Sequence, residues 1–237
     1  MILRPGAGTL FFITQPDHAS LAADLVEHFQ GFAARPRRDA IRLAVREHDS
    51  GWRDLDEAIA FDNANGRPLD FMTVPGQVKQ EVWPTAIDHV RQTSPYAAAL
   101  IAEHALFVYQ ANRVKPEWRD FFETLERRRT SLLTDAGVSR EDLADDYRFV
   151  GLADLLSLAF CNGWHEPRER LGHTVRCAGD EVIVSPALIG PTLVPLAVSG
   201  RRIADKRYAS LGELRAALKA TPIERLTGHA RGEDTPR

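Results

Sequence analysis

A helix that ends in a histidine and an aspartate is predicted by the stretch Ile41-Arg42-Leu43-Ala44-Val45-Arg46-Glu47-His48-Asp49-Ser50-Gly51-Trp52. Its apolar residues fall at helical spacing, and His48 continues the same stripe one turn later. Gly51 stands where a helix C-terminus favours positive φ, which places His48 and Asp49 in the last turn. There the two side chains could hold one metal ion. A polar helix end, with His48 near the C-terminal dipole and Asp49 solvated, explains the pattern equally well.

The composition is that of an ordinary soluble protein. The chain has 237 residues, a net charge of -3, 44% hydrophobic and 27% charged residues, which suffices for a substantial core in one or two domains. The near-neutral charge argues against a nucleic-acid binder. The two cysteines lack CxxC spacing, and the apolar run 10–13 is too short for a signal or membrane segment. We therefore expect a cytoplasmic protein with a small-molecule substrate and no nucleic-acid or membrane partner; its oligomeric state stays open.

Helical patterns dominate the first two thirds of the chain and short strands the last third. We expect a strand at 10–14, helices at 15–29, 38–49, 77–92, 95–108, 115–134, 139–161 and 210–220, and strands at 174–177, 181–185 and 192–198. The irregular stretch 53–78 is long enough to carry a site or a lid. The predicted fold is mainly α, with a helical metal-binding domain at 1–165, a small β-rich appendage packed on it at 166–225, and a disordered tail at 226–237.

Asp154 is the second informative residue. The surrounding residues 150–160 are apolar nearly all round, so the helix that carries it is expected to be buried. An ionised carboxylate there costs several kcal/mol unless it is paired or bound to a metal. A metal ion, a salt bridge to an arginine and protonation all answer that requirement.

Two further histidines lie on inward faces of predicted helices. His104 shares the apolar stripe of 95–108, and His18 begins the stripe of the first helix. Each alone is weak evidence, since single core histidines are usually hydrogen-bonded structural residues. Several such residues on different helices are a stronger indication. Imidazole and carboxylate without thiolate suit Fe, Mn, Zn or Co.

The order of these residues resembles the H…HD…D pattern of the HD-domain superfamily, metal-dependent enzymes built on an α-helical bundle. The chain more closely resembles a bacterial family known as DUF3891, and this resemblance extends through nearly the whole chain. The stretches that carry it are 13–18 (Ile-Thr-Gln-Pro-Asp-His), 48–52 (His-Asp-Ser-Gly-Trp), 94–104 (Ser-Pro-Tyr-Ala-Ala-Ala-Leu-Ile-Ala-Glu-His) and 154–158 (Asp-Leu-Leu-Ser-Leu).

The HD resemblance implies a set of metal ligands. A first ion would be held by His18, His48, Asp49 and Asp154. In members with two ions the aspartate of the HD pair bridges, and two more histidines hold the second ion; His104 fits one of those places. His89 is the candidate for the other, although it lies beside the inner face of its helix. The expected cofactor is one or two first-row divalent ions, with Asp49 and His104 as catalytic residues.

Hydrolysis of a small phosphate ester by metal-activated water is the leading functional hypothesis. Arg46, Arg53 and Arg91 are candidate phosphate contacts, and Glu47 and Glu103 could orient ligands. The aromatic residues Trp52, Phe61, Phe71 and Trp83 could shape an apolar pocket or simply fill the core.

Two alternatives stay open: a di-iron oxygenase of the HD type that cleaves a small organic molecule, and a non-catalytic metal- or ligand-binding regulatory module. Trp52 stands where many HD phosphohydrolases carry a basic residue, which argues against their usual nucleotide or nucleic-acid substrates.

Overall fold

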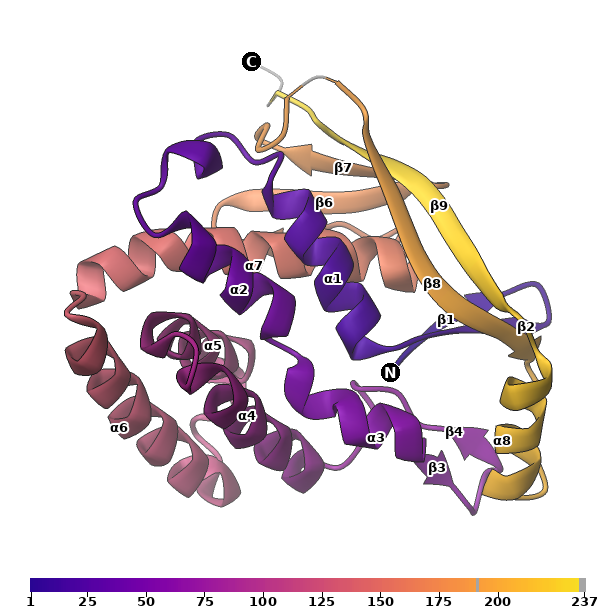
Figure 1. The fold of residues 1–237 in the computed structure, drawn as a ribbon. Helices are drawn as coiled ribbons and strands as arrows, with labels where there is room; N and C mark the ends of the chain where they lie inside the picture. Colours follow the sequence, from indigo (N-terminus) through magenta and orange to yellow (C-terminus); the bar gives the residue numbers. More distant parts are fainter. Residues whose placement is uncertain (191, 235–237) are drawn as a thin grey trace.

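A computed structural model describes residues 1–190 and 192–234. A curled seven-stranded sheet covers one side of a group of helices (Figure 1). Its order is β1-β2-β8-β9-β7-β6-β5, and all neighbours are antiparallel except β7 and β9. The strands are β1 Ile2–Gly6, β2 Thr9–Ile13, β5 Arg168–Arg170, β6 His173–Ala178, β7 Glu181–Ser185, β8 Val194–Ala204 and β9 Ile223–Gly232, with a separate hairpin of β3 Phe61–Asp62 and β4 Arg67–Pro68.

The described residues contain eight α-helices. They are α1 Gln15–Val26, α2 Arg38–Glu47, α3 Arg53–Ala58, α4 Gly76–Arg91, α5 Pro95–Val108, α6 Arg119–Ala136, α7 Arg140–Asn162 and α8 Leu211–Ala220. Helix α7 packs against α1, α2 and α5 and also against β1, β6 and β7. Its second half is buried on all sides, because helices cover one face and the sheet covers the other. Within the described ranges, none of the helices combines the length and apolar composition that a membrane crossing requires.

Local sequence signals place the starts of α1, α5 and α7 correctly. The side chains of Thr14, Ser94 and Ser139 each accept a hydrogen bond from a backbone N–H in the first turn of α1, α5 and α7. The start of α6 is later than the expected residue 115, because 116–118 form a 3₁₀ turn. The stretch 53–78 is only partly irregular, since it contains α3 and the β3–β4 hairpin.

The expectation of a mainly α, HD-like bundle is wrong, because the protein has a mixed α/β fold. Strands from both ends of the chain share one sheet: β2 lies between β1 and β8. Strand β1 was not predicted from the sequence, because it contains Pro5 and Gly6, two residue types that are uncommon in strands. Residues 226–232, expected in a disordered tail, complete β9, whose alternating residues are mostly polar and exposed. The last part of that predicted tail, 235–237, lies outside the described residues.

Glycines within the sheet and helices serve close packing. Strand β8 continues past residue 198, where the expected strand ended, and a Cβ on its Gly200 would lie 2.4 Å from the carbonyl oxygen of Phe12. Gly51 does not adopt positive φ. It lies in a 3₁₀ turn that follows Asp49 and touches α4, where a Cβ would lie 1.9 Å from the carbonyl oxygen of Val82. Because Gly51 has no side chain, the turn that follows His48 and Asp49 can pack directly against α4.

The substitution Gly51→Ala is expected to lower the free energy of unfolding by roughly 1–3 kcal/mol or more, since backbone must move to make room for the methyl group. Urea unfolding followed by circular dichroism measures the loss. Gly212→Ala is the matched control, because an added Cβ there meets only Ser210 Oγ at 3.5 Å. The control should keep or slightly raise stability, as alanine favours a helix. Equal effects of the two substitutions would contradict the packing role of Gly51.

Candidate metal centre

Five of the six predicted ligands converge in the interior. His18 comes from the first turn of α1, His48 and Asp49 from the end of α2, His104 from α5 and Asp154 from the middle of α7. Their exposed fractions lie between 0% and 6%. Helix α7 is the element against which the other three helices pack, so Asp154 lies where all of them meet.

Four of these residues direct one atom each toward a common point. His18 Nε2 lies 3.3 Å from His48 Nε2, 3.4 Å from Asp49 Oδ2 and 3.3 Å from Asp154 Oδ1. His48 Nε2 lies 3.4 Å from both of those carboxylate oxygens. Ligands held about 2.1 Å from one tetrahedral ion are about 3.4 Å apart. The separations therefore fit one first-row divalent ion.

Hydrogen bonds to the other ring nitrogens fix which atoms face the centre. His48 Nδ1 lies 2.6 Å from the carbonyl oxygen of Val45, which can only accept, so Nδ1 carries the proton. His18 Nδ1 lies 2.9 Å from Ser157 Oγ, whose own hydrogen is donated to the carbonyl oxygen of Asp154. With the proton on Nδ1, the neutral form of each imidazole would present its Nε2 lone pair to the centre, which is the arrangement of metal-binding histidines.

The shifted pKa values of the cluster show that positive charge is stabilised there. Burial alone would lower the pKa of His48, but Asp49 and Asp154 outweigh burial and raise it to about 9. The pKa of His18 is raised well above its usual value for the same reason. Burial opposes the ionisation of Asp49 and Asp154, yet the neighbouring cations hold the pKa of both carboxyls below the usual range. Without a metal ion, the imidazoles of His18 and His48 therefore favour their protonated forms.

His104 differs from the other two histidines. Its Nε2 lies 3.6 Å from Asp154 Oδ2, and its Nδ1 lies 3.1 Å from Tyr147 Oη. Burial, assisted by the charges of His48 and Arg170, lowers the pKa of His104 to about 3. His104 is therefore neutral at physiological pH. The structure does not bring His89 to the cluster, since its side chain is exposed on α4.

Arg170 is the residue of this centre that the sequence analysis missed. Its guanidinium donates hydrogen bonds to Asp154 Oδ2 at 2.5 Å and to the carbonyl oxygen of Gly151 at 2.9 Å. It comes from β5, a three-residue strand that no pattern predicted. The one available signal was the need of a buried Asp154 for a partner, and a salt bridge to an arginine was one of the three solutions that the sequence left open.

A cavity of about 170 Å³ opens onto this centre. Asp49, His104, Asp154, Arg168 and Arg170 supply its polar and charged lining. Of the four aromatic residues considered for a pocket, three line it and Phe61 does not; those three are Trp52, Phe71 and Trp83.

Gln15 and Trp83 also line the cavity, and each carries a buried polar atom, Gln15 Oε1 and Trp83 Nε1, that has no hydrogen-bond partner within the geometric limits among the described residues.

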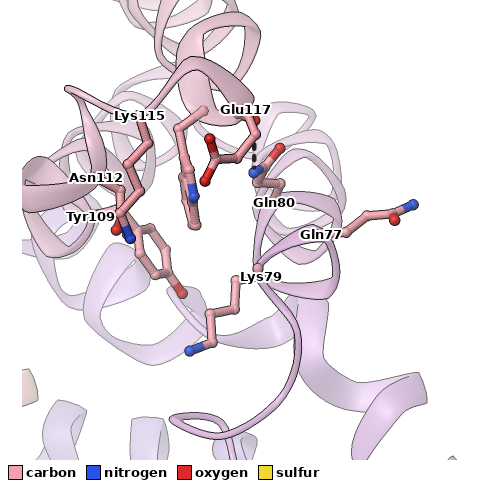
Figure 2. A pocket seen from close by; sticks show the side chains of 9 residues that line it. Gln77, Lys79, Gln80, Tyr109, Asn112, Lys115 and Glu117 are labelled. Carbon is pink, nitrogen blue, oxygen red and sulfur yellow. Dashed lines mark hydrogen bonds between the residues drawn. The ribbon is translucent and has the colours of Figure 1, made fainter.

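A second, larger hollow of about 610 Å³ adjoins the first, and Tyr109 lines both. Figure 2 shows its wall, with Lys79 and Gln80 on α4 opposite Tyr109 and Lys115. Gln80 donates a hydrogen bond to the carbonyl oxygen of Glu117 across one side. This hollow offers room for a part of a bound molecule that the smaller cavity cannot contain.

Other predicted contacts lie elsewhere. Arg46, Arg53 and Arg91 are exposed and do not line the cavity. Glu103 pairs with the buried Arg129 rather than with a ligand. Glu47 lies 3.9 Å from Arg53.

Fold and site together define a mixed α/β protein with a buried centre of histidines and aspartates. The chain belongs to the family described as "Protein of unknown function (DUF3891)", whose model matches residues 1–195. The matched range contains all five clustered ligands and Arg170, whereas most of β8, all of α8 and all of β9 lie beyond it. No curated protein matches the chain, and no solved structure matches it. The comparisons therefore lend no support to the resemblance to HD domains.

The metal-free protein is expected to lose stability as the pH rises from about 6.5 to 9. The pKa of His48 is higher in the folded state, at about 9, than its ordinary 6.5, so its contribution is complete below pH 6.5 and disappears through pH 9. Urea unfolding at a series of pH values in chelator should show a fall of roughly 1–3 kcal/mol. His48→Gln should reduce the fall, and the contribution of His18, whose pKa is also raised, should remain. A wild-type stability that rises over this range would contradict the protonated cluster.

Proposed function

We propose that this protein is a metal-dependent hydrolase of a small phosphate ester, with a first-row divalent ion held by His18, His48, Asp49 and Asp154. The observation that carries the proposal is the approach of the two imidazole Nε2 atoms, which lie 3.3 Å apart and each 3.3–3.4 Å from one oxygen of Asp49 and one of Asp154. Such a group of buried lone pairs needs compensating positive charge, which a metal ion would supply and which bound protons supply in its absence.

A bound ion of this kind supplies a water molecule of lowered pKa and polarises a phosphoryl oxygen. The residues of the chain provide the rest. His104 is neutral beside Asp154, so its ring adds no charge to the cavity and can orient a bound molecule through a hydrogen bond at Nε2. Arg168 and Arg170 line the cavity and offer positive charge to a phosphate group. The adjoining hollow beyond Tyr109 would contain the leaving group of the ester.

The choice of hydrolysis rests on the two guanidinium groups in the cavity lining and on the order of the proposed ligands along the chain. That order, His18, His48-Asp49 and Asp154, follows the HD pattern without the all-helical HD fold. The same donors would also suit the iron of an oxygenase, and a non-catalytic module would need only the metal. The two guanidinium groups in the cavity favour an anionic substrate, and a phosphate ester is the anionic substrate that hydrolysis by metal-activated water would use.

Removal of a ligand is expected to remove the metal. His48→Ala and Asp154→Asn should each lower the metal content of protein loaded with Mn²⁺ or Zn²⁺ at least tenfold, measured by mass spectrometry of the elements. Hydrolysis of p-nitrophenyl phosphate and the rise in melting temperature caused by metal should be lost with it. Asp154→Asn keeps the side-chain volume, so a folded variant is expected.

His89→Ala, His173→Ala and His229→Ala are the controls. His89 is exposed on α4, and the other two lie on β6 and β9, outside the cluster. All three should keep the wild-type metal content. Metal content that does not respond to Asp154→Asn would refute the proposed centre.

A further inference from the structure

The two oxygens of Asp154 face different partners. Oδ1 lies 3.3 Å from His18 Nε2 and 3.4 Å from His48 Nε2. Oδ2 accepts the hydrogen bond from Arg170 and lies 3.6 Å from His104 Nε2. In a two-metal centre, the second oxygen and a further histidine are the atoms that a second ion would need. Here an arginine already occupies that side of the carboxylate.

Arg170 is fixed in this position by its surroundings. The side chain is 16% exposed, and its guanidinium lies 5.8 Å from the centre of the Phe107 ring. Arg170 pairs with His173 across the β5–β6 turn, where Leu171 and Gly172 both adopt positive φ. The bond to the carbonyl oxygen of Gly151 ties the group to α7 one turn before Asp154. A guanidinium keeps its charge at all physiological pH values, so this positive charge is permanent.

We propose that Arg170 replaces a second metal ion, so that the centre holds one divalent ion per chain and the guanidinium acts on the phosphate of the substrate. This inference rests on the proposed function and adds the number of ions to it. His48, His104 and Asp154 could by geometry alone form a second cation site. The charge and the hydrogen bond of Arg170 exclude a second cation there. The exposure of His89 removes the other histidine that a second ion would require.

The experiment counts ions. Wild-type protein dialysed against Mn²⁺ should contain about one ion per chain and give the electron paramagnetic resonance spectrum of isolated Mn²⁺. Arg170→Met removes the charge but keeps an apolar stem beside Phe107. This variant should bind a second ion, with an affinity at least tenfold lower than that of the first. It should then show the spectrum of a magnetically coupled Mn²⁺ pair. Arg168→Met is the matched control and should bind one ion, because Arg168 stacks on Trp164 rather than pairing with Asp154.

A second variant tests the inference without altering Arg170. His104→Ala should leave the wild-type count of one ion unchanged, whereas a two-ion centre would lose an ion. Two ions in the wild type, or a single ion in folded Arg170→Met, would overturn the role assigned to Arg170. A wild type that binds no ion at all would overturn the proposed metal centre itself, so the two failures are distinguishable.

Discussion

The structure depends on the compensation of buried negative charge on α7. Asp154 lies at the level where α1, α2 and α5 meet α7, and burial alone would drive its carboxyl to protonate. Instead, Arg170 and the imidazoles of His18 and His48 keep it ionised. Each of these partners comes from a different element, so their common need to reach Asp154 constrains the relative placement of two helices and the β5–β6 hairpin. The same contacts therefore determine both the geometry of the centre and the packing of these elements.

The site residues that could be predicted are those that interrupt the apolar face of a predicted helix. His18, His48, His104 and Asp154 are polar residues on stripes that are otherwise apolar, and a polar residue in such a position needs a partner in the interior. The helical spacing of apolar residues was therefore sufficient to select these four residues. It also correctly indicated that His89 lay beside its stripe, although the resemblance to HD domains kept that residue in the ligand set.

The remaining features depend on contacts between distant parts of the chain. Strand β9 is stabilised by β7 and β8 on its two sides, so it tolerates alternate polar residues that made it resemble a tail. The role of Gly51 is set by the backbone of α4, which no local pattern around residue 51 reveals. Arg170 is one of many arginines in the sequence, and only the β5–β6 turn selects it as the partner of Asp154.

The charge of the cavity connects this arrangement to the proposed substrate. Its charged lining consists of two carboxylates, Asp49 and Asp154, and two guanidiniums, Arg168 and Arg170, so the lining alone is neutral. A divalent ion among the ligands would leave a net charge of +2 in a small enclosed space. A phosphate monoester carries a charge of about −1.5 to −2 at neutral pH. A neutral organic substrate would gain nothing from this excess, whereas a phosphate dianion would balance it without any further change in protonation.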